Sequence, residues 1–343
     1  MAYPNNIFLF ALISFFSIPS VFSQIGGEST YQFLNLVSSP RQAALGGKVF
    51  TNVDYDVTQA LFNPSTINTD MDKQLALNYS SYLGGISYGT AAYAYTVDRH
   101  VQTFHGGITY INYGSFDGFD EEGNSTGTFT GNEVALSFGY AFQIGYSDFF
   151  LGFNGKFITS KLEDFNSLGI ASDLGLLYIN DDLDLNATLV IRNLGTQITT
   201  YADLRETLPF EVALGLSQRL ANVPIRWHLT LENLHQWPIS EANPAREQSG
   251  FSGSESSKKP GFLGQVIRHT IVGAELFPEK AFNIRLGYNF RRGDDLRILE
   301  QRNFSGLSAG FALKMNTLRF SYTHAKYTSA SNANFFGLQI DLK

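Results

Sequence analysis

The feature that most restricts the fold of this sequence is a strict alternation of large apolar residues with small or polar ones, recurring from Gln74 to the end of the chain. In the clearest example, Val134, Leu136, Phe138, Tyr140, Phe142 and Ile144 interleave with Glu133, Ala135, Ser137, Gly139, Ala141 and Gln143. Because successive side chains of a β-strand point to opposite faces, the pattern predicts a strand with one apolar, aromatic face. Six large apolar residues on one face would span the apolar band of a bilayer.

The polar face of the alternating segments repeatedly carries charge. The charged residues expected to point inward are Glu133, Asp173, Arg192, Glu211, Arg219, Arg226, Glu232, Arg285 and Lys314. Such a set is typical of a barrel with a polar lumen and a lipid-facing exterior. A soluble sandwich also alternates, so periodicity alone does not separate these two folds.

The lengths of the connections separate them better. We predict strands over 73–83, 86–97, 101–115, 131–144, 147–161, 169–180, 183–194, 209–220, 224–236, 268–277, 281–291, 305–315, 318–327 and 332–342, about fourteen in all. Connections after even strands are short, and most of those after odd strands are longer: 116–130, 162–168, 195–208, 237–267 and 292–304. This asymmetry is typical of short periplasmic turns and long outer loops, with Gly84-Gly85 as the exception. Unpaired strand edges are too costly in lipid, so we expect an all-β, closed antiparallel outer-membrane β-barrel.

Composition excludes several other classes of protein. The formal charge of −7 and the pI near 5.4 argue against nucleic-acid binding, which needs a basic face. Past the first two dozen residues no apolar run approaches the roughly 20 residues of a membrane-spanning helix. The absence of cysteine excludes disulfides, a thiol nucleophile and a lipoprotein anchor.

The first residues have the features of a secretory signal peptide. An apolar stretch over 7–18 precedes Pro19 and Ser20, and we expect cleavage after Ser23. The segment departs from the usual pattern because no Lys or Arg precedes the apolar stretch. A short membrane anchor is the alternative, but about twelve apolar residues are too few to span. The expected organisation is a signal peptide over 1–23, a hatch over 24–72 and a transmembrane barrel over 73–343.

The segment between the signal peptide and the first strand lacks alternation. Pro40 to Ala44 predicts the start of a short helix, and Gly46-Gly47 its end. Asn63-Pro64 ends a helix or turn before the chain enters the wall. A fourteen-strand barrel has room for this segment, so we expect short helices and loops in the lumen. The hatch motif consists of Gly46, Gly47, Asp56, Phe62, Asn63 and Pro64.

These residues resemble the FadL-like outer-membrane family and, more closely, its PorV/PorQ branch from the type IX secretion system of Bacteroidetes. The resemblance rests on Ala43 to Gly47, on the stretch from Asp56 to Pro64, and on a hatch followed by about fourteen strands. The opening Tyr31 to Leu36, followed by Pro40-Arg41, is most similar to the PorQ type. The resemblance implies a barrel that holds a surface complex, with PorZ as the expected partner and the PorU/PorV sortase unit nearby.

Few residues suggest catalysis. Residues 85–89 and 306–310 match the serine-hydrolase elbow, but both fall within predicted strands, whereas an elbow needs a strand, a sharp turn and a helix. His105, His228 and His324 show no catalytic spacing. We therefore expect no enzyme, no cofactor and no metal site, although a barrel hydrolase remains conceivable. The acidic segment 117–124 does not match the calcium-loop spacing and is best interpreted as a solvated loop.

The outer loops are the expected contact region for a partner. The candidate residues are Asp117, Asp120, Trp237, Ile239, Arg246, Phe251, Phe262, Leu263, Arg292 and Arg297. The apolar residues among them could instead pack on the rim of the barrel. The arginines could meet lipopolysaccharide phosphates, but Asp294, Asp295 and Glu300 offset them and favour a self-paired loop.

Two functional hypotheses follow. The first is an anchor that holds a surface protein through the outer loops. The second is a FadL-like transporter of hydrophobic small molecules, which would need an apolar tunnel. The charged inward set favours the anchor, but a one-residue slip of register would reverse the faces of any strand.

Overall fold

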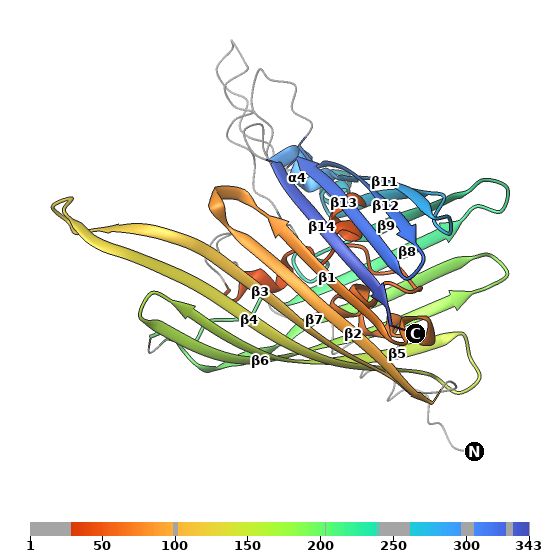
Figure 1. The fold of residues 1–343 in the computed structure, drawn as a ribbon, viewed down its shortest axis with the longest axis horizontal. Helices are drawn as coiled ribbons and strands as arrows, with labels where there is room; N and C mark the ends of the chain where they lie inside the picture. Colours follow the sequence, from red (N-terminus) through yellow and green to blue (C-terminus); the bar gives the residue numbers. More distant parts are fainter. Residues whose placement is uncertain are drawn as a thin grey trace, which may run out of the picture.

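The wall of the molecule is a closed barrel of fourteen antiparallel strands in which neighbours in sequence are neighbours in space (Figure 1). The computed structural model describes residues 29–98, 102–202, 204–237, 239, 261–295, 305–326 and 332–342. β1 pairs with β14, with Gln74 opposite Asp341 and Ser81 opposite Asn334, and this pairing closes the sheet. The prediction of a closed fourteen-strand barrel is confirmed.

The strands differ in length around the wall. They are β1 (Gln74–Ser81), β2 (Ser87–Asp98), β3 (Gln102–Phe119), β4 (Ser125–Gln143), β5 (Phe149–Leu162), β6 (Phe165–Asn180), β7 (Leu185–Thr199), β8 (Glu211–Arg219), β9 (Ile225–Leu231), β10 (Thr270–Leu276), β11 (Phe282–Asn289), β12 (Leu307–Met315), β13 (Leu318–Lys326) and β14 (Asn332–Asp341). β3 to β7 therefore form a tall side, and β8 to β14 a shorter one (Figure 1).

The alternation of side chains follows the predicted faces. Along β4, Glu133 and Ala135 are buried while Leu136 and Phe138 are exposed, Phe138 by 69%. Buried polar residues on the inner face and exposed apolar residues on the outer face reverse the arrangement of a soluble protein. The outer surface of this wall is therefore suited to hydrocarbon.

The sequence-based prediction of long outer loops is wrong at two places. Residues 116–130 largely continue β3 and β4, with Ser115 opposite Thr130 and Phe116 opposite Phe129, so Asp117 lies on a strand and Asp120 in the turn. Residues 162–168 contain only the two-residue turn Glu163-Asp164 between β5 and β6. The Gly, Ser, Thr and Asp content suggested loops, but Thr and Phe also favour strands when a partner strand lies alongside.

Several short helices accompany the strands. Those that follow β1 in the sequence are η5 (Leu83–Gly85), α3 (Phe262–Arg268) and α4 (Phe290–Asp295). α4 replaces the last residues of the strand expected over 281–291, because the chain turns at the end of β11. In the described part of the chain, no helix is both long enough and apolar enough to cross a membrane.

The segment before β1 lies inside the barrel, as predicted (Figure 1). It contains η1 (Gln32–Asn35), α2 (Pro40–Ala44), η2 (Val57–Leu61), η3 (Pro64–Thr66) and η4 (Thr69–Met71). α2 packs on β11 to β14, η2 on β1 to β3, and η3 on β4 to β6, so the segment contacts opposite sides of the wall. We call residues 29–72 the hatch. Its side chains Phe33, Leu45, Phe50 and Met71 are completely buried and form the core of the molecule with the inner wall.

Some predicted features lie outside the described residues. These are the signal peptide over 1–23, residues 24–28 of the predicted hatch, and the candidate contact residues Arg246, Phe251 and Arg297.

Candidate functional site

The predicted hatch motif forms the turns that fold the hatch. Asp56 caps η2, accepting hydrogen bonds from the Thr58 backbone N–H at 3.2 Å and the Thr58 hydroxyl at 2.5 Å. Asn63 caps η3 and accepts from the backbone N–H of Ser65 at 3.1 Å. Its amide also donates to the Phe50 carbonyl at 2.7 Å and to Thr188 Oγ1 of β7 at 3.0 Å. Asn63 therefore fixes both the local turn and its position against the wall.

Phe62 and Pro64, on either side of Asn63, complete this turn. Phe62 is the C-cap of η2, and Pro64 occupies the first position of η3, where its missing N–H costs nothing. The guanidinium of Arg192 from β7 lies 3.9 Å from the centre of the Phe62 ring. Both residues thus serve the packing of the hatch against the wall.

The end of α2 depends on two glycines. Ser39 accepts from the Gln42 backbone N–H at the start of α2, and Gly46 and Gly47 follow its end with φ of 99° and 130°. A Cβ on Gly46 would lie 2.6 Å from Cγ2 of Ile271 and 3.2 Å from the backbone nitrogen of Tyr288. Glycine is needed there for both its conformation and its small size.

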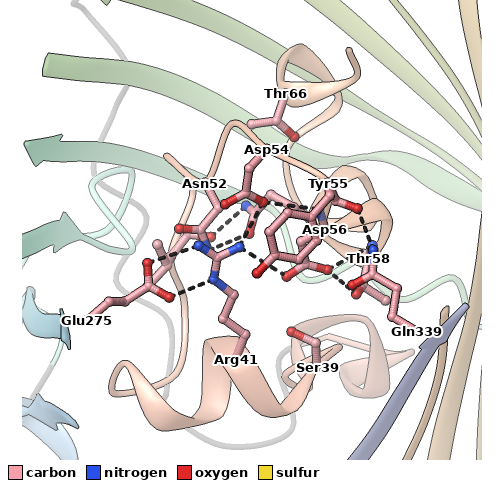
Figure 2. Close-up of polar contacts among 12 residues, drawn as sticks. Ser39, Arg41, Asn52, Asp54, Tyr55, Asp56, Thr58, Thr66, Glu275 and Gln339 are labelled. Carbon is pink, nitrogen blue, oxygen red and sulfur yellow. Dashed lines mark hydrogen bonds and ion pairs between the residues drawn. The ribbon is translucent and has the colours of Figure 1, made fainter. Parts of the chain in front are cut away.

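Arg41 of α2 is the centre of a buried ionic cluster that joins the hatch to the wall (Figure 2). Its Nε and Nη2 donate to the two carboxylate oxygens of Glu275 on β10 at 2.8 and 2.9 Å. Its Nη1 donates to Asp54 of the hatch at 2.8 Å and lies 3.8 Å from Asp56. A bidentate arginine–carboxylate pair constrains both distance and orientation, so α2 is held at a defined place on the wall.

Two further arginines balance the charge of this cluster. Arg285 Nε lies 3.1 Å from Glu275, and Arg226 lies 3.5 Å from Asp54 and 3.7 Å from Glu275. Arg41, Arg226 and Arg285 thus face Asp54, Asp56 and Glu275, with no net formal charge. Burial favours a higher pKa for Asp54, but the adjacent Arg41 outweighs this and lowers the pKa to about 2, so Asp54 is ionised at neutral pH.

A second buried cluster lies nearer the outer end of the barrel. Lys48 of the hatch contacts Glu211 of β8 at 2.6 Å and Glu232 at 3.3 Å. Arg192 contacts the other oxygen of Glu211 at 2.7 Å and donates to the Leu34 carbonyl of the hatch at 2.9 Å. The hatch is therefore joined by ion pairs to β10 through Arg41 and to β8 through Lys48.

Inward-facing glycines of the wall make space for the hatch. A Cβ on Gly287 would lie 2.1 Å from Gly46 N, and one on Gly152 would lie 2.2 Å from Ser65 N. Equivalent close approaches, all under 3.0 Å, occur at Gly107 to Leu61, Gly139 to Ile67, Gly169 to Tyr31, Gly175 to Asn63, Gly310 to Ala44 and Gly337 to Pro40. A side chain at many points on the inner wall would displace the hatch, so hatch and wall are packed as one unit.

Sequence reasoning identified some of these residues but not their pairing. It placed Glu211, Arg192, Arg226, Glu232 and Arg285 on the inner face, where the structure also has them. It missed Arg41, Lys48 and Asp54 of the hatch and Glu275 of β10. The usable signal for the three hatch residues was charge in a segment otherwise rich in apolar and small residues. Two other residues that were expected to point inward lie at strand ends, away from the buried clusters. Arg219 is half exposed at the end of β8 and pairs with Asp184 and Glu279, and Lys314 is exposed at the end of β12.

Among the residues considered for catalysis, Ser308 and His324 lie on neighbouring strands but on opposite faces of the wall, with Ser308 buried and His324 exposed. Ser308 Oγ on β12 accepts from the Gly46 N–H and donates to the Ala44 carbonyl, both at 3.1 Å. His105 is buried on β3, His228 lies 3.5 Å from Glu275, and His324 contacts Asn334. Their contacts are those of wall and hatch packing.

Comparison with solved structures shows what kind of barrel this is. The toluene transporter TbuX of Ralstonia pickettii is similar over 91% of this chain and 100% of that one, with 14% identity and a TM-score of 0.54. The chain has the barrel fold of this transporter. A Pseudomonas aeruginosa FadL homologue (8% identity, 90% of this chain, 99% of that one, TM-score 0.48) and the KdgM porin (5%, 79%, 99%, 0.32) also match. Neither a family model nor a curated protein matches the sequence.

At the mouth of the barrel, a cavity of about 320 Å³ lies above the hatch. The cavity is lined on the hatch side by Asn35, Leu36, Val37, Gly47 and Lys48. The rest of its lining consists of Tyr82, Glu232, Asn289, Arg291 and Arg292. Its lining therefore combines apolar hatch residues with charged residues of the wall and α4.

The candidate contact residues at the mouth differ in accessibility. The Trp237 ring stacks on the His269 ring, with the two centroids 4.4 Å apart. The centroid of the Phe262 ring lies 5.7 Å from that of Trp237. Trp237, Phe262 and Leu263 are exposed, but Ile239 is buried and therefore unsuited to contact a partner. Asp120 accepts hydrogen bonds within its own turn from Glu122 and Asn124, and Arg292 belongs to α4.

Proposed function

We propose that this outer-membrane barrel is an anchor that holds a protein at the cell surface. The observation that supports the proposal is that a hatch fills the lumen. Buried ion pairs join this hatch to β8 and β10, and it packs closely on inward glycines of strands from β3 to β14. A plug that has to leave or rearrange would have to break buried charge pairs, each of which is costly to separate. A rigid, filled barrel is suited to present a fixed outer surface.

The resemblance to the PorV/PorQ branch gives this proposal a specific form. The chain would be an anchor component of a type IX protein secretion system. Its partner would be a PorZ-like surface protein, near a PorU/PorV sortase unit. The hatch motif that carries the resemblance, from Asp56 to Pro64, has a clear structural role in this barrel, because its turns position the hatch against β4 to β7.

Transport of hydrophobic small molecules is the second candidate, favoured by the fold shared with the toluene transporter TbuX. Two cavities beside the hatch argue against a passage at their positions. They have volumes of about 20 and 10 Å³, which is roughly the space for a single water molecule. The larger cavity at the mouth is lined by Lys48, Glu232, Arg291 and Arg292, whose charges disfavour an uncharged hydrocarbon.

Affinity isolation of the chain from cells distinguishes these functions. We expect a surface-exposed protein to co-isolate in a fixed ratio with the tagged chain after mild detergent extraction, and not with an unrelated tagged barrel from the same cells. The purified chain should carry no hydrophobic small molecule that mass spectrometry detects. A bound hydrophobic molecule, together with isolation of the chain alone, would contradict the anchor and favour the transporter.

A further inference from the structure

Four apolar side chains project above the hatch on the lumen side of the tall wall. Along β4, the inward positions Ala135, Glu133 and Gly131 are buried, and the next one, Phe129, is 37% exposed. Along β5, the exposed fraction rises from buried Ser160 to 37% at Leu162. The hatch therefore stops covering the inner wall at this level, and the wall continues beyond it.

The neighbouring strands place two more apolar residues on the same face. Phe165 of β6 pairs with Leu162 and is 51% exposed. On β3, a bulge lies between Asn112 and Ser115, with Gly114 at φ 83°. The bulge changes which residues of β3 face the lumen, so Phe116 lies on the lumen side, paired with Phe129. The Phe116 ring is 41% exposed and stacks on that of Phe129 with centroids 5.3 Å apart. We call Phe116, Phe129, Leu162 and Phe165 the mouth ridge.

The position of the mouth ridge separates it from the lipid-facing surface. Its side chains lie on the face opposite to Leu136 and Phe138, which point outward from the same wall. Figure 1 shows the β3/β4 hairpin as the farthest-reaching part of the wall, with the β5/β6 hairpin beside it. An aromatic belt at a membrane interface would face outward, so membrane anchoring does not explain these exposed inner residues.

The charge around the mouth ridge indicates the chemistry of what covers it. The hairpin segments 114–130 and 163–168 contain Asp117, Asp120, Glu121, Glu122, Glu163 and Asp164 and no Lys or Arg. The nearest basic residue in the sequence, Lys161, alternates onto the outward face of β5. A second copy of this acidic chain, or the phosphates of lipopolysaccharide, would meet like charge here. A basic protein surface would meet opposite charge.

We propose that the mouth ridge is the docking surface for a surface protein whose contact patch has an apolar centre and a rim of Lys and Arg. This inference rests on the proposed anchor function and assigns its contact to residues on the inner face of the tall wall. Aromatic side chains at the centre of such a contact commonly carry most of the binding free energy, while the charged rim steers association.

Single cysteines provide the test, because the chain contains no cysteine of its own. Phe165→Cys in whole cells is labelled with a membrane-impermeant maleimide-benzophenone reagent, irradiated, and the adducts are identified by mass spectrometry. Phe119→Cys is the matched control, because Phe119 is 65% exposed on the neighbouring β3/β4 hairpin but follows Gly118 onto the opposite face. We expect at least tenfold more adduct from position 165, joined to a segment of another protein that is rich in Lys and Arg.

A triple substitution separates this inference from the anchor function itself. Phe116→Ser, Phe129→Ser and Phe165→Ser together should reduce the co-isolated partner at least tenfold, and Phe119→Ser should leave it unchanged. Heat-modifiable migration on gels checks that each variant still forms a barrel. If the partner co-isolates equally with the triple variant, or if the adducts are lipopolysaccharide, a second copy or this chain itself, the mouth ridge is not the docking surface although the anchor function stands. If no partner co-isolates with the unaltered chain, both proposals fail.

Discussion

Replacing Arg41 with methionine should lower the free energy of unfolding by about 3–5 kcal/mol, the range typical of breaking a buried ion pair. The substitution removes three hydrogen bonds to Glu275 and Asp54 and leaves three carboxylates facing two arginines in a buried site. Methionine keeps similar bulk, so the effect reports charge and hydrogen bonding. Urea unfolding followed by tryptophan fluorescence, with the protein in lipid vesicles, measures the change.

The matched control for Arg41 is Arg219→Met. Arg219 also contacts two carboxylates, Asp184 and Glu279, but in exposed turns. Exposed pairs of this kind contribute roughly 0–1 kcal/mol. Equal destabilisation by the two substitutions would show that the buried cluster does not hold the hatch.

The second large effect is expected from the inward glycines. Gly287→Ala and Gly152→Ala each place a methyl group within about 2.2 Å of hatch backbone atoms, which cannot rotate away as a side chain can. Each should cost about 1–3 kcal/mol. The two sites contact different parts of the hatch, around Gly46 and around Ser65, so the costs should nearly add in the double variant.

Limited proteolysis provides a second readout for these variants. The hatch should become cleavable in the Gly152→Ala/Gly287→Ala barrel and remain protected in the unaltered protein. Gly155→Ala is the control, because a Cβ there meets only Phe153 Cε1 at an ordinary distance of 3.7 Å. Persistent protection and unchanged stability in the double variant would contradict tight packing between hatch and wall.

The wall of this protein could be predicted from its sequence because membrane exposure is a local property. Each strand needs apolar residues at every second position whatever its neighbours are, so β4 could be assigned with its correct inner and outer faces from residues 131–144 alone. The end of α2 was equally local, since Gly46 and Gly47 take conformations that few other residues adopt.

The hatch contacts could not be predicted in this way, because they join residues distant in sequence. Arg41 and Glu275 are separated by 234 residues, and nothing near either one identifies the other. The role of Gly287 likewise depends on which hatch atoms lie opposite it. The extension of β3 and β4 was missed because their outer residues form a strand only through pairing with each other, as Phe116 and Phe129 do.

The central claim is that the hatch seals the lumen as a fixed part of the barrel, and ionic conductance across a planar lipid bilayer tests it most directly. The unaltered chain should insert without opening a steady channel, and Arg41→Met should raise the conductance by loosening the hatch. A large, steady conductance from the unaltered barrel, unchanged by Arg41→Met, would show an open path past the hatch and contradict the claim.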